Sequence, residues 1–296
     1  EDLYLFAFFA FLVAFAGSIQ DIAIDAFRIE VAELSEQGNL AASYQFGYRM
    51  AILVASSFAL IFAADYGWRL TYQLMAVFMM IGVIGASICP EVLNKKLERL
   101  TFKSSFIEPL RDFLSRFGIY MSSLLLMIIA TYRLTDIVMG PMASPFYLDS
   151  GYTLKEIGYI VKIVAVVASI IGFFLGGLLV KKVGVKTTLI IGAFLVMLTN
   201  LSFSSVAILE KDLTLLGLVV GLDSLAAGVV GTANITFLTS LVSKKYTAVQ
   251  YALLTSFMML PGKVFSGFSG LIADYFKNLY GNDYGWMIFF VITSFL

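Results

Sequence analysis

The sequence contains no histidine, a single cysteine and only five prolines among its 296 residues. The lone Cys89 excludes a disulfide within the chain and a metal site built from several cysteines. The absence of histidine excludes a Ser-His-Asp triad and a histidine proton relay. Carboxylates are therefore the side chains left to exchange protons near neutral pH.

Charge is also scarce, since only 14% of the residues are charged, whereas about a quarter are charged in soluble proteins. Hydrophobic residues make up 60% of the chain, and the mean hydropathy is +0.91. This composition predicts an all-α membrane protein that crosses the bilayer several times. The formal net charge is zero and the basic residues do not cluster with aromatic ones, so no nucleic-acid partner is expected.

A helix needs about 20 apolar residues to cross the ~30 Å hydrocarbon layer of a membrane. On this basis nine spans are predicted, at residues 3–26, 41–64, 71–89, 117–139, 157–180, 187–208, 213–236, 248–273 and 285 to the end. One set of connections holds eleven basic residues: Lys95, Lys96, Arg99, Lys103, Arg111, Arg116, Lys181, Lys182, Lys186, Lys244 and Lys245. The opposite set holds four: Arg69, Lys155, Lys211 and Lys277. Because basic loops stay inside, the first set is expected in the cytoplasm.

The tetrapeptide DYGW occurs at 65–68 and again at 283–286, each time just before a predicted span. Upstream, Gln45-Phe46 and Gln250-Tyr251 stand at matching places, which indicates two duplicated halves. The span at 213–236 then pairs with the one at 3–26, and three further helices are expected before Glu1. The predicted organisation is residues 1–89 (helices 4–6), a cytoplasmic linker at 90–116, and a six-helix bundle at 117–296 with a truncated last helix.

Ionisable residues inside a span are costly and tend to face a cavity. Asp21, Asp25 and Arg28 lie on one helical face, because they are spaced i, i+4 and i+7. Arg49 is expected within reach of Asp21 or Asp25. Arg28 and Glu30 are expected to form only the solvated rim of this stripe.

The second half carries its own intramembrane charges. Arg133 and Asp136 are i, i+3 neighbours, and Lys162 enters the next span from the same side, so Asp136 is expected to pair with Arg133, with Lys162 or with both. Asp223 is the acid nearest the midplane, with Asn234 further along its helix, and Lys263 follows a predicted kink at Pro261-Gly262. These residues fit either a structural ion-pair network or the lining of a solute path, and both interpretations stay open.

Twelve helices in two halves with a cytoplasmic linker resemble the major facilitator superfamily. The segment GGLLVKKVGVKTTL, residues 176–189, resembles that superfamily's G-x-L-x-D-R-x-G-R-K motif. Gly177, Leu179, Lys182, Gly184 and Lys186 fit the motif. Lys181 stands where the motif has aspartate, so the usual charge contact of that aspartate is not expected here.

A more specific resemblance covers essentially the whole chain. QDIAIDAFRIE resembles the Q-D-I-x-x-D-A signature of the AmpG-type muropeptide permeases, and YRLTDIVMGPMASPFYLDSGYTLKEIGYIVKI and FSGFSGLIADYFKNLYGNDYGW continue the match. The resemblance implies proton-driven import of N-acetylglucosaminyl-anhydro-N-acetylmuramyl peptides across the bacterial inner membrane, with no cofactor. The residues expected on the substrate and proton path are Gln20, Asp21, Asp25, Tyr48, Arg49, Tyr132, Arg133, Asp136, Lys162, Asp223, Asn234 and Lys263.

Other functions remain as alternatives. The same scaffold can carry another solute, such as an acyl-CoA compound, a sugar phosphate or a drug, or the chain can be a truncated remnant that does not transport. A membrane-embedded enzyme would need a catalytic histidine, a DxD-like pair or a catalytic loop, and the sequence offers none. The expected partners are the lipid bilayer, a glycopeptide substrate and protons, and the protein is expected to act as a monomer.

Overall fold

A computed structural model describes residues 2–90 and 102–295, and all regular structure in these ranges is helical. Within them, the side chains of Lys103, Lys155 and Lys162 lie outside the described part. The longer helices are α1 (Asp2–Val31), α2 (Gln37–Leu53), α3 (Ala59–Ile88), α4 (Phe102–Thr131), α8 (Ala165–Val183), α9 (Val185–Ile208), α10 (Leu213–Leu241), α11 (Thr247–Ser266), α12 (Ser269–Tyr280) and α13 (Asn282–Ser294). The short ones are α5 (Leu134–Met139), α6 (Ala143–Asp149), α7 (Leu154–Tyr159), the 3-10 turns η1 (Leu34–Glu36) and η3 (Gly140–Met142), and the π-helical turns η2 (Val54–Phe58) and η4 (Ile160–Val164).

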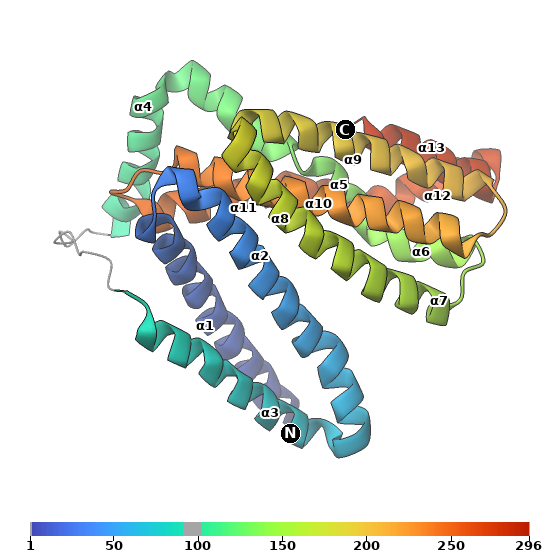
Figure 1. Ribbon diagram of the computed structural model, residues 1–296, viewed down its shortest axis with the longest axis horizontal. Coiled ribbons are helices and arrows are strands. Elements are labelled where there is room, and N and C mark those ends of the chain that lie inside the picture. The colour runs from blue at the N-terminus through green and yellow to red at the C-terminus, as the bar shows by residue number, and fades with distance from the viewer. Residues whose placement is uncertain (1, 91–101, 296) are drawn as a thin grey trace.

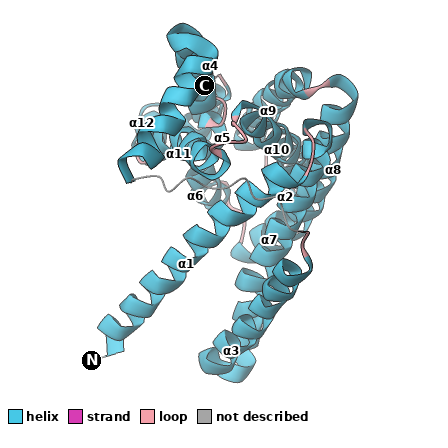
Figure 2. Cartoon of the chain, turned by 90° about the vertical axis from the view of Figure 1, so that its left-hand side faces the viewer, coloured by secondary structure: helices cyan, strands magenta, loops and turns pink. Residues whose placement is uncertain are grey.

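Two groups of helices, α1–α3 and α4–α13, lie against each other at one end (Figure 1). Figure 2 shows α1 running away from α9–α12 toward the N-terminus. The helices and turns at the end where the groups meet contain five basic residues: Arg116, Lys181, Lys182, Lys244 and Lys245. We call this end the basic end. By the positive-inside rule this is the end that the sequence predicts to face the cytoplasm.

Six helical segments in the described ranges are long and apolar enough to cross a membrane, judged by length and composition. They are Leu3–Val31, Asp65–Ile88, Phe106–Asp149, Ala165–Val183, Val185–Ile208 and Leu213–Leu241. The predicted count of nine is therefore not confirmed. The predicted span at 41–64 falls on α2, η2 and the start of α3, where Gln45 and Arg49 dilute the apolar residues. The helix α11 carries Lys263 beside Pro261, and α13 has only 13 residues.

The two DYGW copies differ in the turn they form. In the first, Gly67 has φ +79° and ψ 161°, a conformation that a residue with a Cβ rarely adopts, and the chain reverses there inside α3 (Figure 1). In the second, the residue with positive φ is Gly281, before the motif. Trp286 is then 1% exposed, whereas Trp68 is 55% exposed. The repeat thus marks two chain reversals with different local geometry.

The predicted linker ends in an amphipathic segment that docks on the second group. Residues 91–101 lie outside the described ranges, and Gly118, with φ +73°, separates the two parts of α4. Arg116 donates from Nη2 to the Leu241 carbonyl (2.9 Å) and to Oε1 of Gln250 (3.1 Å). Gln250 in turn donates from Nε2 to the Pro109 carbonyl (2.8 Å). The segment before Gly118 is thereby fixed to the turn between α10 and α11.

A seam of glycines lets α8 approach α10 on one side and α2 on the other. A Cβ built on Gly228 would lie 2.6 Å from the Ser169 carbonyl oxygen, and one on Gly176 would lie 2.9 Å from that of Val229. Toward α2, a Cβ on Gly38 would lie 3.0 Å from Val180. Helices in lipid associate through such close backbone contacts, because lipid tails compete well with larger apolar side chains.

At the end opposite the basic end, Thr153 and Glu156 form a capping box that starts α7. The Glu156 carboxylate accepts hydrogen bonds from the Thr153 amide (2.8 Å) and from Nζ of Lys211 (2.8 Å). These bonds stabilise the ionised form and lower the pKa of Glu156 to about 2, with the Lys211 bond as the largest cause.

We predict that Gly228→Val prevents assembly of the α8–α10 contact, because the added side chain collides with the Ser169 backbone. Overpacking of this kind costs about 1–3 kcal/mol or more. The measurement is thermal unfolding of the purified protein in detergent. Gly217→Ala in the same helix is the matched control, since a Cβ there meets nothing within 4 Å, and it should leave the midpoint unchanged or slightly raised.

We also predict that Lys211→Gln raises the pKa of Glu156 from about 2 toward its ordinary 4.5. Because the folded-state pKa lies below the unfolded one, the contact stabilises the fold above about pH 4.5 and loses this effect as the pH falls toward 2. Carboxyl ¹³C chemical shifts followed through an acid titration measure the change. Lys244→Gln at the basic end serves as the control, and an unmoved Glu156 midpoint in Lys211→Gln would contradict the assignment.

Candidate functional site

A cavity of about 450 Å³ lies between the two helix groups, within the ~300–1,000 Å³ typical of ligand sites. One wall comes from α1 and α2, and the other comes from α10, α11 and the junction of α4 and α5. The lining residues are Ser18, Asp21, Ile22, Asp25, Tyr44, Gln45, Tyr48, Arg133, Gly231, Asn234, Ile235, Leu238, Ala248, Tyr251, Ala252, Thr255, Ser256 and Met258.

The two walls carry opposite charge. Asp21 and Asp25 lie on α1, one turn apart, while Arg133 faces the cavity from the second group. Tyr44 and Tyr48 of α2 and Tyr251 of α11 add aromatic faces with hydroxyl groups. The cavity can therefore hold a polar solute that carries a carboxylate and sugar-like rings, because guanidinium groups bind carboxylates and tyrosine rings pack on apolar ring faces.

Arg133 stands at a break between α4 and α5, where its own backbone leaves the helical conformation. The predicted pairing with Asp136 is present, with Nε of Arg133 3.8 Å from Oδ2 of Asp136. That distance is too long for a hydrogen bond. Nε of Arg133 is buried and makes no hydrogen bond to the described residues, so one donor of the guanidinium remains unused.

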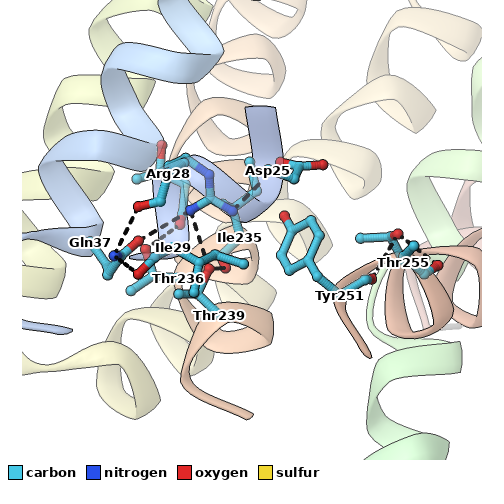
Figure 3. Close-up of polar contacts among 11 residues, drawn as sticks. Asp25, Arg28, Ile29, Gln37, Ile235, Thr236, Thr239, Tyr251 and Thr255 are labelled. Atoms are coloured by element: carbon cyan, nitrogen blue, oxygen red, sulfur yellow. Dashed lines mark hydrogen bonds and ion pairs between the residues drawn. The ribbon is translucent and has the colours of Figure 1, made fainter. Parts of the chain in front are cut away.

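Arg28 lies beneath the acidic wall and is one of the most enclosed charged side chains in the described structure, at 4% exposed (Figure 3). The expectation that it would form a solvated rim is wrong, whereas Glu30 is exposed. Nη1 of Arg28 donates to Oε1 of Gln37 (3.3 Å) and to Oγ1 of Thr239 (3.2 Å). Its Nη2 lies 3.7 Å from Oδ1 of Asp25. The physical reason is that α10 and α11 cover this face of α1 and replace water around the guanidinium.

Arg49, expected within reach of Asp21 or Asp25, does not pair with either acid in the described structure. Asp25 faces Arg28 instead, because both project from the same face of α1 one turn apart. Among the described residues no ion pair joins Arg49 to either acid, and the half-buried Arg49 has an Nε without a hydrogen bond.

Gln37 organises the turn that joins α1 to α2. Its side chain is 1% exposed, and its Nε2 donates to the carbonyls of Arg28, Ile29 and Ala32, each at 3.2 Å. The Arg28 and Ile29 carbonyls belong to the last turn of α1, which has no further helical amides to bond, and Ala32 follows directly after the helix. Gln37 thus caps α1 and at the same time presents its own oxygen to Arg28.

The structure places the remaining predicted path residues in several environments. Asn234 lines the cavity and donates from Nδ2 to Sδ of Met258 (2.8 Å). Tyr132 points away from it and donates to the Leu189 carbonyl (2.9 Å). Asp223 accepts from Oγ1 of Thr199 (3.1 Å) outside the cavity lining. Gln20 and Lys263 are exposed, and the Lys162 side chain lies outside the described part.

The glycine motif at 176–189 lies at the basic end. Gly177 faces Gly38 in the seam, and Gly184 adopts φ +84° at the turn from α8 to α9. Lys182 and Lys186 are exposed. Lys181, which stands at the motif's aspartate position, lies 3.2 Å from Oε1 of Glu36 in η1. The lysine that replaces the motif's aspartate therefore forms an ion pair with an acid of the other helix group.

Three residues of this site were not expected from the sequence: Gln37, Tyr44 and Thr239. In the sequence, Tyr251 is marked only by the repeat that matches Gln250-Tyr251 to Gln45-Phe46. The i, i+3 spacing of Asp25 and Arg28 in the sequence indicates that these two residues of the site lie together on α1. Thr239 offered no signal, because it lies 211 residues further along the chain from Arg28. In the described residues, no group of three or more His, Cys, Asp or Glu side chains could hold a metal ion.

Comparison with known proteins agrees with this architecture. The Major Facilitator Superfamily model matches residues 1–292. The chain is 30% identical over 302 residues to the putative transporter AmpG 4 of Rickettsia conorii, covering 100% of this chain and 70% of that protein. It is 29% identical over 286 residues to the anhydromuropeptide permease of Escherichia coli K12, covering 96% of this chain and 56% of that protein. The chain therefore belongs to the Major Facilitator Superfamily and, within it, to the AmpG-type transporters.

Proposed function

We propose that the protein imports anhydromuropeptides released from the cell wall across the bacterial inner membrane, in symport with protons. The observation that carries this proposal is the cavity between the two helix groups, with acids on one wall and Arg133 on the other. The relative from Escherichia coli is named an anhydromuropeptide permease, and the chain matches it over 96% of its own length.

The cavity chemistry suits this substrate class. An anhydromuropeptide joins two sugar rings to a short peptide with carboxylates. The Nε of Arg133 makes an ion pair but no hydrogen bond in the described structure, and Arg133 is the group we assign to a substrate carboxylate. Tyr48 and Tyr251 lie on opposite walls, where they can pack on the apolar faces of sugar rings.

Proton coupling requires an acid whose partners differ between the outward-facing and inward-facing states. We assign this role to Asp25 and Asp136. Asp25 lies on the first group and stands next to Arg28, which also bonds to the second group. Asp136 lies 3.8 Å from Arg133, the cation that we assign to the substrate. Asp21 and Asp223 are the second candidates in their respective halves. The proton gradient supplies the energy, so no cofactor is required, and we propose a monomer.

We predict that membrane vesicles containing the protein accumulate radiolabelled anhydromuropeptide when a proton gradient, acidic outside, is imposed. Vesicles without the protein provide the background. Excess unlabelled anhydromuropeptide should abolish the signal, while acetyl-CoA should not. Uptake of labelled acyl-CoA in place of the glycopeptide would overturn the substrate assignment, and absence of any uptake would overturn the transport function of this chain.

We further predict that Asp25→Asn and Asp136→Asn abolish the dependence of uptake on the proton gradient, because an amide cannot exchange a proton. Counterflow exchange of preloaded substrate, which needs no net proton movement, should persist in at least one of the two. Asp65→Asn is the matched control, since Asp65 is exposed at the turn remote from the basic end. Gradient-driven accumulation that survives in all four variants, Asp25→Asn, Asp136→Asn, Asp21→Asn and Asp223→Asn, would contradict the proposed coupling.

A further inference from the structure

We propose that Arg28 is the positioning residue that holds the basic ends of the two helix groups together and links this closure to the contents of the cavity. This inference rests on the proposed transport function for its meaning, although the contact itself is tested without substrate. It assigns to Arg28 a role that neither the signature motif nor the relatives' names specify.

The first argument is the distribution of the bonds of Arg28 between the groups. Nη1 donates both to Gln37, which belongs to its own group, and to Thr239 of α10, which belongs to the other. Gln37 is itself anchored to three carbonyls at the end of α1. One guanidinium nitrogen therefore ties the α1–α2 turn to α10, as Figure 3 shows.

The second argument is the pair of tyrosine rings around the guanidinium. Cζ of Arg28 lies 5.6 Å from the ring centroid of Tyr44, on α2, and 5.2 Å from that of Tyr251, on α11. Both distances are within the ~6 Å at which a cation is attracted to a ring face. Each helix group supplies one ring, so separation of the groups at this end removes part of the cation's environment.

The third argument is the position of these partners relative to the cavity. Asp25, Tyr44 and Tyr251 line the cavity, whereas Arg28 does not. A bound solute therefore reaches Arg28 through the three side chains that surround it. A ligand that forms hydrogen bonds with Asp25 or Tyr251 takes contacts away from Arg28 and weakens the closure.

The fourth argument is that the cluster is incompletely bonded. Nε and Nη2 of Arg28 and Oδ1 of Asp25 are buried and make no hydrogen bond to the described residues. A buried cation with unused donors is stabilised less by its surroundings than a cation whose donors are all bonded. The cluster thus combines bonds that join the two groups with unused donors on Arg28, for which a solute that bonds to Asp25 or Tyr251 would compete.

The experiment measures access to the cavity from each side of the membrane. Cys89→Ser removes the one native cysteine, after which Ala248→Cys reports from the basic end and Ser18→Cys reports from the α1 wall. A membrane-impermeant maleimide is applied to everted vesicles for the basic side and to right-side-out vesicles for the opposite side. No substrate is added, so the result does not depend on which solute the protein carries.

We predict that Arg28→Gln raises the labelling rate of Ala248→Cys from the basic side about tenfold, which corresponds to ~1.4 kcal/mol. The same variant should lower labelling of Ser18→Cys from the opposite side, because opening one side closes the other. Arg28→Lys, which keeps the charge but loses the forked geometry, should give a smaller change. Arg111→Gln, an exposed arginine at the same end, should change neither rate.

Thr239→Val distinguishes loss of the contact from misfolding, because it removes one acceptor of Arg28 and leaves the α1–α2 turn intact. It should shift both rates in the same directions as Arg28→Gln. Labelling that rises from both sides in Arg28→Gln would indicate general loosening, and together with unchanged rates in Thr239→Val it would overturn the proposal. If the reciprocal shift appears while glycopeptide uptake is absent, the closure stands and the proposed substrate fails. If glycopeptide uptake is present without the reciprocal shift, the proposed substrate stands and the role of Arg28 in the closure fails.

Discussion

The cost of keeping a positive charge away from water governs the meeting point of the two helix groups. A guanidinium that is 4% exposed requires acceptors and ring faces to replace its hydration. α1 alone cannot supply them, since its own contribution is Asp25 at 3.7 Å. The remaining partners come from α2, α10 and α11. The arrangement of these four helices at the basic end thus follows from the need to surround one side chain.

Two further contacts belong to the same end and differ in kind. The glycine seam joins α2 to α8 through close backbone approach, which depends on shape alone. The Lys181–Glu36 pair is exposed to solvent on both sides, so its contribution to stability is small. It shows, however, how a lysine is accommodated where the superfamily motif has an aspartate: an acid from the other group provides the opposite charge. The glycine seam, the buried Arg28 and the exposed Lys181–Glu36 pair therefore all contribute to the same interface between the helix groups.

Much of this organisation follows from the sequence, and the exceptions have physical causes. The helical class, the family and the clustering of Asp21, Asp25 and Arg28 on one face can all be read from composition, motifs and spacing. Pairing of Arg133 with Asp136 follows from their i, i+3 relation. The burial of Arg28 could not be predicted in this way, because Thr239 and Tyr251 are brought to it by tertiary packing. The predicted count of nine spans is not confirmed where polar residues such as Gln45 and Arg49 interrupt an apolar stretch, since a window of residues cannot tell a cavity-facing side from a lipid-facing one.

The contact between Gly38 and Gly177 has one more consequence. A Cβ on Gly177 would lie 3.1 Å from the Gly38 carbonyl oxygen, and the side chains beside this contact are the short ones of Ala42 and Val180, so no long side chains interlock there when one helix rolls over the other. At such a contact the angle between α2 and α8 can vary while the distance between the two helices stays nearly constant. Rocking of α2 against α8 about this point would change the separation of the remote helix ends far more than that of the glycines themselves.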